Sequence, residues 1–178
     1  MKDMIETTAD EVLTFRKPEP RDGSDVWALI RACKPLDENS MYCNLIQCDH
    51  FADTCILAEK DGVPVGWISG YRLPDAPDTL FVWQVAVSSK ARGLGLGSEM
   101  LDRLLSRDDL AGVRRLKTTI TRDNDPSWRL FRSLAERHGG ILSDEPHYRK
   151  DDHFDGEHAT EHMVTIRFPA PVARARAA

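Results

Sequence analysis

The feature that most constrains the fold is a glycine-rich loop between an apolar strand pattern and a helical pattern. Residues 80–87 form a strongly apolar run, and residues 96–105 carry leucine and methionine at helical spacing. Between them stand Arg92 and glycines at positions 93, 95 and 97. Glycine lets backbone N–H groups turn toward an anion, and the helix start adds unpaired donors and the positive end of its dipole. The segment predicts a diphosphate cradle, with Arg92 as a charged partner.

The spacing of these glycines restricts the kind of diphosphate ligand. A nucleotide P-loop needs Gly, four residues and then Gly-Lys-Ser/Thr, a string that the sequence lacks. The dinucleotide fingerprint is Gly-x-Gly-x-x-Gly, whereas this loop reads Gly-x-Gly-x-Gly. The remaining pattern is Arg-x-x-Gly-x-Gly. A plain strand–helix turn is the alternative, and the arginine and the flanking periodicities weigh against it.

The other patterns along the 178 residues predict one mixed α/β domain. Two β-prone runs flank Asp61-Gly62, a hairpin signal, and Pro126 begins a helix with an apolar inner face. In the helix expected over 39–51, Leu45, Ile46 and Cys48 should point inward. The expected order is strand 12–15, helices at 26–33 and 39–51, strands at 55–59, 64–71 and 80–87, a helix from 96, strand 115–121, a helix from 126, a polar loop, and one or two closing strands, the last at 163–168.

The domain is expected to span residues 11–168, with flexible tails at 1–10 and 169–178. The formal net charge of −5 argues against nucleic acid as a partner, because phosphate binding needs a basic surface. The longest uncharged core-like segment, residues 79–89, is too short to span a membrane, and the N-terminus has no signal-peptide pattern. We therefore expect a cytoplasmic protein with reduced cysteines.

The glycine-rich string resembles the coenzyme A loop of the GCN5-related N-acetyltransferases, the GNAT family. Residues 124–131 resemble the next helix of that family, where an asparagine and a small residue contact the pantetheine arm. The resemblance implies acetyl-CoA as co-substrate, no metal, and a mixed, mostly antiparallel sheet with splayed central strands flanked by helices. The pantetheine arm would pair with the strand near residues 83–87. The implied cofactor-binding residues are Val85, Val87, Arg92, Gly93, Gly95, Gly97, Ser98, Asn124, Ser127 and Phe131.

One position departs from the family pattern. Many members carry a tyrosine that protonates the leaving thiolate where this chain has Phe131, and phenylalanine has no proton to give. Coenzyme A must leave as a thiolate, or take its proton from water or from another residue.

Residues 36–51, 81–84 and 157–161 resemble a branch of this family that acetylates the γ-amine of L-2,4-diaminobutyrate in ectoine biosynthesis. That resemblance is near full-length and implies a homodimer. A small cationic substrate suits carboxylates and an aromatic face. The expected substrate-binding residues are Asp37, Asn39, Tyr42, Trp83, Glu157 and Glu161, and the expected catalytic residues are Trp83, Val85 and Glu161.

These assignments leave alternatives open. Asp37 can be only a helix N-terminal residue, and Tyr42 and Trp83 can be core aromatics. An alkylammonium has a pKa near ~10, so the site needs a group that accepts its proton. Glu161, Glu157 and Asp37 are all candidates for this base. An acetyltransferase for another small amine or a protein amine, and a non-catalytic acyl-CoA sensor, are the competing functions.

A rival pattern lies at the C-terminal end. Residues 158–162 read His-x-x-Glu-His, the string of one zinc protease class. Two histidines four residues apart share a zinc ion on a helix, but this segment leads into a strand pattern, where they would lie about 13 Å apart. The metal interpretation is therefore disfavoured for residues 158–162. Cys43, Cys48 and His50 lack a second ligand cluster, which favours packing and pocket-lining roles for them.

Overall fold

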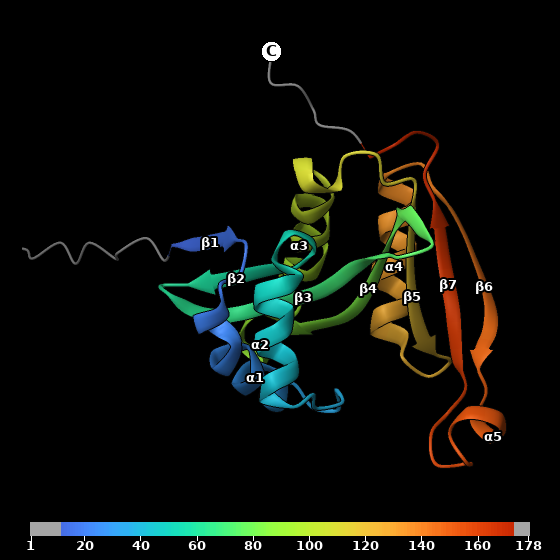
Figure 1. The fold of residues 1–178 in the computed structure, drawn as a ribbon, viewed down its shortest axis with the longest axis horizontal. Coiled ribbons are helices and arrows are strands. Elements are labelled where there is room, and N and C mark those ends of the chain that lie inside the picture. Colours follow the sequence, from blue (N-terminus) through green and yellow to red (C-terminus); the bar gives the residue numbers. More distant parts are fainter. Residues whose placement is uncertain (1–11, 173–178) are drawn as a thin grey trace, which may run out of the picture.

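The computed structural model describes residues 12–172, which form a seven-stranded sheet with helices on both faces (Figure 1). The strand order is β1-β2-β3-β4-β5-β7-β6. Neighbouring strands are antiparallel except β4 and β5, which are parallel. The strands are β1 (Leu13–Arg16), β2 (Ile56–Lys60), β3 (Val63–Leu73), β4 (Ala76–Val87), β5 (Arg115–Thr121), β6 (Ile141–Tyr148) and β7 (Glu161–Arg167).

The helices divide the core into two layers. Side chains of α1 (Gly23–Ala32) and α2 (Met41–His50) pack with Leu57 and Trp67 on one face of the sheet. Those of α3 (Leu96–Leu105) and α4 (Asp125–Arg137) pack with Ile56 and Ile68 on the other. Neighbouring strand residues point to opposite faces, so β2 and β3 contribute to both layers. A short helix, α5 (Lys150–His153), lies between β6 and β7 along the chain.

The apolar stripes predicted for α3 and α4 are confirmed. All five stripe residues of α3 are buried, as is the expected inner face of α4, and Pro126 stands in the first turn of α4. The buried residues are Leu96, Met100, Leu101, Leu104 and Leu105 of α3, and Trp128, Phe131, Leu134 and Ala135 of α4.

The two central strands diverge after a short parallel pairing. β4 pairs with β5 only from Thr79 to Phe81, although β4 continues to Val87 and β5 to Thr121. Figure 1 shows the resulting V between the two strands. The predicted splay of the central strands is therefore present, and one edge of β4 is left open beyond Phe81.

A bulge lies where β4 begins to diverge. On β3, Ser69 is opposite Gln84 and Gly70 is opposite Val82, which leaves Trp83 without a partner on β3. A Cβ on Gly70 would lie 2.7 Å from the Phe81 carbonyl oxygen, so the close approach of β3 and β4 at this point requires glycine. The Trp83 side chain is 47% exposed at this point.

Two local expectations were only partly right. The region expected to be a polar loop contains α5 and β6, the second of the one or two expected closing strands. Most of β6 is exposed, so the strand shows little apolar alternation. In α2 Cys48 is buried as expected and Ile46 is half-buried, but Leu45 is 36% exposed, and the other buried positions are Asn44 and Gln47. Leu45 lies against α1, because a Cβ on Gly23 would approach its Cδ2 to 2.5 Å.

The predicted N-terminal tail, residues 1–10, and the last part of the C-terminal tail lie outside the described residues. Residues 169–172 are described, and the Val172 N–H donates to the Val113 carbonyl at 2.8 Å. The start of the predicted C-terminal tail therefore contacts the domain. Between residues 12 and 172, no helix combines the length and apolarity needed to cross a bilayer.

Candidate active site

The glycine-rich loop has the backbone geometry of an anion cradle. Gly93 and Gly95 have φ angles of 77° and 76°, in the left-handed region that glycine favours. Gly95 is the N-cap of α3, and its carbonyl accepts the Glu99 N–H at 3.0 Å. The N–H groups before Glu99 in the first turn have no carbonyl partner within the helix. The donors of Leu96, Gly97 and Ser98 therefore belong to the end of α3 that attracts an anion.

The open edge of β4 faces the space from which β5 diverges. The Ser88 N–H donates to Val65 of β3 at 2.8 Å, so the backbone groups of Val85 and Val87, which alternate with it, point to the opposite edge. The Val87 carbonyl accepts from Arg92 Nε at 3.1 Å and from Cys33 Sγ at 3.3 Å. Arg92 is thus tied to the end of β4, beside the loop that it is predicted to serve.

The start of α4 brings the other predicted cofactor residues to the same end of the sheet. Asn124 Oδ1 accepts the Ser127 N–H at 3.2 Å and caps the helix. Phe131 is 2% exposed and packs in the core below α4. Neither contact tests the predicted roles toward coenzyme A, which remain predictions.

A pocket of about 450 Å³ lies at the ends of β5, β6 and β7 and brings two of the predicted carboxylates together. Asp37 comes from the segment after α1, and Glu161 from the first position of β7. Sequence reasoning did not identify the other lining residues, which come from β5, β6, α5 and the segment before β7. They are Thr119, Tyr148, His153, Phe154 and His158.

Gln84 fixes the segment that carries Asp37. Its Nε2 donates to the Asp37 carbonyl at 2.9 Å, and its Oε1 accepts from Asn39 Nδ2 at 3.1 Å. The Asn39 carbonyl also accepts from Trp27 Nε1 at 3.0 Å. Because Gln84 follows the bulge at Trp83, these bonds tie the 37–39 segment to β4 where it opens.

Glu161 is the carboxylate most affected by its surroundings. Its side chain is 19% exposed, and burial raises its pKa, with the nearby Asp37 and Asp123 acting in the same direction. The imidazole of His158 and the hydroxyl of Thr119 oppose this rise. Within the described part of the chain, its buried Oε2 makes no hydrogen bond. Glu161 is therefore a candidate proton acceptor whose pKa is shifted toward neutral pH.

Besides Asn39, three other predicted substrate-binding residues do not line this pocket. Trp83 is exposed at the splay, Tyr42 is 71% exposed on α2, and Glu157 is exposed in the segment before β7. Their predicted contacts with substrate remain predictions.

The two histidines of the zinc-type string lie in different environments. His158 lines the pocket, whereas His162 is 7% exposed and its Nδ1 lies 3.2 Å from Asp144 Oδ2. His162 follows Glu161 in β7 and therefore points to the opposite face. Across residues 12–172, no group of three or more His, Cys, Asp or Glu side chains could hold a metal ion. The four cysteines are free thiols.

Comparison with known proteins places this geometry in a family. Residues 23–135 match the model of the acetyltransferase (GNAT) family. An L-2,4-diaminobutyric acid acetyltransferase from Vibrio cholerae is 47% identical over 85% of this chain and 88% of its own length. One from Halomonas elongata is 44% identical over 86% and 80%, respectively.

Solved structures agree with the sequence matches. The diaminobutyrate acetyltransferase from Paenibacillus lautus, solved with L-2,4-diaminobutyric acid and coenzyme A, superposes with a TM-score of 0.85 at 40% identity. The match covers 91% of this chain and 96% of that one. Ard1 from Thermoplasma volcanium has a TM-score of 0.68 at 19% identity, over 88% and 98% of the two chains, and shares the fold. The predicted fold class and family resemblance are confirmed: the chain belongs to the GNAT family and, within it, to the L-2,4-diaminobutyric acid acetyltransferases.

Proposed function

We propose that the chain transfers the acetyl group of acetyl-CoA to the γ-amine of L-2,4-diaminobutyrate. The product is Nγ-acetyl-diaminobutyrate, and the reaction is a step of ectoine biosynthesis. The observation that carries this proposal is the pocket that joins Asp37 and Glu161 beside the opened end of the sheet. Two carboxylates suit a substrate with two ammonium groups. The P. lautus enzyme, 40% identical, was solved with the same amine and coenzyme A.

The cofactor half of the reaction uses the backbone. The loop at Arg92 to Gly97 and the start of α3 hold the diphosphate of acetyl-CoA, and the pantetheine arm follows the open edge of β4. Val85 offers a backbone N–H to the thioester carbonyl, where negative charge develops during attack. A pantetheine amide that bonds to the Val87 carbonyl competes with Arg92 and Cys33 for it.

The amine half requires proton removal. An ammonium group bound near Asp37 gives one proton to a carboxylate, and the free amine attacks the thioester carbon. The C–N bond forms and the C–S bond breaks. The second proton that leaves nitrogen balances the thiolate, so each turnover releases one proton to solvent. Phe131 cannot protonate the thiolate, which takes its proton from water or another group.

Among the three candidate bases, Glu161 has the strongest support. The Glu161 side chain is more buried than those of Asp37 and Glu157, and burial raises its pKa. The raised pKa brings Glu161 closer to the working pH of a general base. Glu157 is exposed and does not line the pocket. Asp37 lines the pocket and is the better candidate for holding the second ammonium group.

Location and assembly are part of the same proposal. Acetyl-CoA as co-substrate and four free thiols support a cytoplasmic enzyme. The partly exposed apolar side chains of Met41, Tyr42 and Leu45 on α2 support a homodimer, because exposed apolar patches are common contact surfaces. Light scattering of the purified protein measures the mass and tests this assembly.

Thiol release from acetyl-CoA tests the proposed reaction. Diaminobutyrate should be turned over faster than ornithine, lysine or a peptide amine. Asp37→Ala and Trp83→Ala should each lower kcat/KM for diaminobutyrate at least about tenfold, equivalent to ~1.4 kcal/mol, while acetyl-CoA still binds. The exposed Glu136→Ala on α4 is the matched control. Equal turnover of ornithine and lysine would remove the substrate assignment, and no thiol release with any amine would favour an acyl-CoA sensor.

A further inference from the structure

His158 stands at the pocket wall with one ring nitrogen already committed. Its Nδ1 lies 2.7 Å from the Ala159 carbonyl oxygen, and a carbonyl only accepts hydrogen bonds. Nδ1 therefore carries a hydrogen, and Nε2 is the nitrogen that gains and loses a proton. The ring of Phe154 lies 4.7 Å from the imidazole centroid and supports it from the side. The ring is thus held with its titrating nitrogen on a defined side.

That titrating nitrogen lies next to the proposed base. His158 Nε2 is 3.8 Å from Glu161 Oε1, just beyond direct hydrogen-bond distance, so a small rotation or one water molecule connects them. The Glu161 side chain is 19% exposed and that of His158 is 37% exposed. A path from Glu161 to His158 therefore leads from the closed part of the pocket toward solvent.

We propose that His158 is a positioning residue that acts through Glu161, taking up the proton that Glu161 receives from the substrate ammonium and passing it to solvent. This inference rests on the proposed function. In sequence, the ammonium N–H bond breaks toward Glu161, the Glu161 proton moves to His158 Nε2, and His158 returns it to water. Both side chains are then restored, and the single proton released per turnover is accounted for.

Titratable and charged groups face the pair from four other elements. Asp37 faces it from the segment after α1, Asp123 from the turn before α4, His153 from α5 and Tyr148 from β6. The two aspartates raise the pKa of Glu161, whereas His158 lowers it. Loss of His158 should therefore leave Glu161 harder to ionise.

The pH profile of His158→Gln tests the inference. The acid limb of kcat/KM for diaminobutyrate should move upward by about 0.5–1 pH unit, because a nearby cation no longer favours ionised Glu161. The rate at neutral pH should fall about tenfold to a hundredfold. Imidazole added to His158→Ala should restore part of the lost rate, because it replaces the missing proton acceptor. His50, at the end of α2, is exposed and does not line the pocket, so His50→Gln should change neither quantity.

Each alternative gives a different result. If His158 instead holds the substrate carboxylate, His158→Gln raises KM with an unmoved acid limb and His158→Ala gains nothing from imidazole, which overturns the inference. An unchanged KM for acetyl-CoA and an unchanged melting temperature show that the variants fold, and His158→Asn serves if the Gln variant does not. Wild-type enzyme that fails to acetylate diaminobutyrate overturns the proposed function itself, whereas active wild type with unmoved variants overturns only the inference.

Discussion

At the scale of single residues, the N-terminal half depends on one arginine between two acids. Arg16 donates to both carboxylate oxygens of Asp22 and both of Glu59, at distances of 2.7–2.8 Å. The Asp22 and Glu59 side chains are only 10% and 14% exposed. The hydrogen bonds from Arg16 hold the pKa of Asp22 below its ordinary value. Arg16 thereby joins β1 to β2 and to the turn before α1.

Arg16→Gln should strongly destabilise the fold. It leaves two largely buried carboxylates without their cation, a loss of about 3 kcal/mol in the free energy of unfolding by analogy with broken buried pairs. The matched control is Arg21→Gln, whose partner Glu19 and whose own side chain are both exposed, with an expected change below about 1 kcal/mol. Urea titrations of the three proteins measure the difference. Similar losses in both variants would contradict this account.

The same arginine predicts an acid sensitivity. Because the folded-state pKa of Asp22 is lowered, its contribution to stability is present above the unfolded pKa near ~3.9 and is lost as pH falls through the folded value. In Arg16→Gln this part of the acid dependence should disappear, so the two unfolding curves should converge as pH falls toward 3. Urea titrations at several pH values measure the convergence.

At the scale of elements, the bulged end of β4 and the segment after α1 act as one unit. Gln84 holds Asp37 and Asn39 by two hydrogen bonds, so the position of the Asp37 carboxylate depends on a side chain that does not line the pocket. The unit therefore couples the opening of the sheet to the acidic wall of the proposed substrate pocket.

Gln84→Leu should weaken substrate binding selectively. Loss of both hydrogen bonds frees the 37–39 segment and should weaken substrate binding by about 1–2 kcal/mol. That loss corresponds to a rise of about fivefold to thirtyfold in the KM for diaminobutyrate. The KM for acetyl-CoA should stay unchanged, because the backbone edge of β4 is intact. Gln84→Glu keeps an acceptor for Asn39 and should have an intermediate effect. Glu38→Ala, whose side chain pairs with Lys34, is the control within the same segment. A KM that rises equally for both substrates would contradict the model.

Elements with a clear apolar period could be predicted from the sequence, and those without one could not. The stripes of α3 and α4 and the alternation in β5 give unambiguous periods, and all three elements form as expected. β6 is an edge strand with mostly exposed residues, so its sequence resembles a polar loop. α2 buries Asn44 and Gln47, which hydrogen-bond to each other at 3.0 Å, and hydrophobicity alone would place both outside.

The pocket shows the same limit. Asp37 and Glu161 were predicted through family resemblance, and the structure brings them together. Three other lining residues, His153, Phe154 and His158, belong to α5 and the segment that follows it. That part of the sequence has no hydrophobic period to show which side chains point inward. Gln84 lies within residues 81–84, which carry the family resemblance, but its hydrogen bonds depend on a segment 45 residues earlier folding over it. Only the tertiary structure supplies that information.

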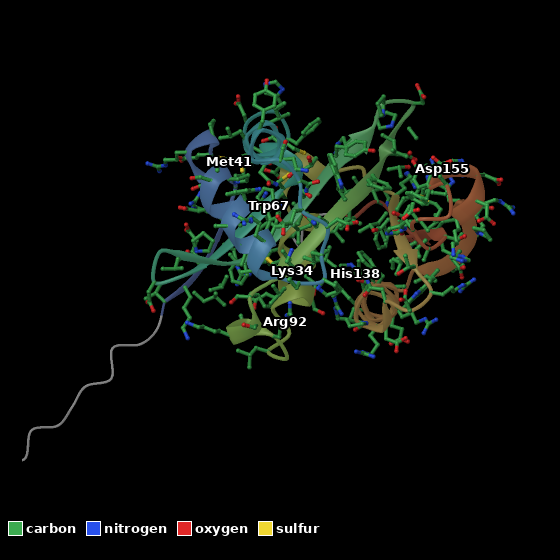
Figure 2. The ribbon with its side chains drawn as sticks, turned by 90° about the horizontal axis from the view of Figure 1, so that it is seen from below. Lys34, Met41, Trp67, Arg92, His138 and Asp155 are labelled. Atoms are coloured by element: carbon green, nitrogen blue, oxygen red, sulfur yellow. The ribbon has the colours of Figure 1, made fainter. Side chains whose placement is uncertain are left out.

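At the scale of the whole molecule, the splayed sheet separates the two halves of the site. The proposed cofactor loop joins β4 to α3, whereas most of the proposed substrate pocket belongs to β5, β6, α5 and β7. Figure 2, which looks at the molecule from below, shows Arg92 and Asp155 of the segment after α5 on different sides. The acetyl group must therefore reach the amine along the open edge of β4. This separation predicts that a substitution on either side will change the KM for one substrate and leave the KM for the other unchanged.

Arg92→Ala tests this separation. A charge-assisted contact to phosphate is worth roughly 1.5–3 kcal/mol, so the KM for acetyl-CoA should rise at least about tenfold, while the KM for diaminobutyrate stays within about twofold. Arg92→Lys keeps the charge and should recover part of the lost affinity for acetyl-CoA. Arg137 lies at the other end of α4 from Asn124, so Arg137→Ala should change neither KM. Asp37→Ala should show the opposite split. If Arg92→Ala raised the KM for the amine as much as that for acetyl-CoA, the loop would act on both halves of the site, and the two-sided arrangement would be wrong.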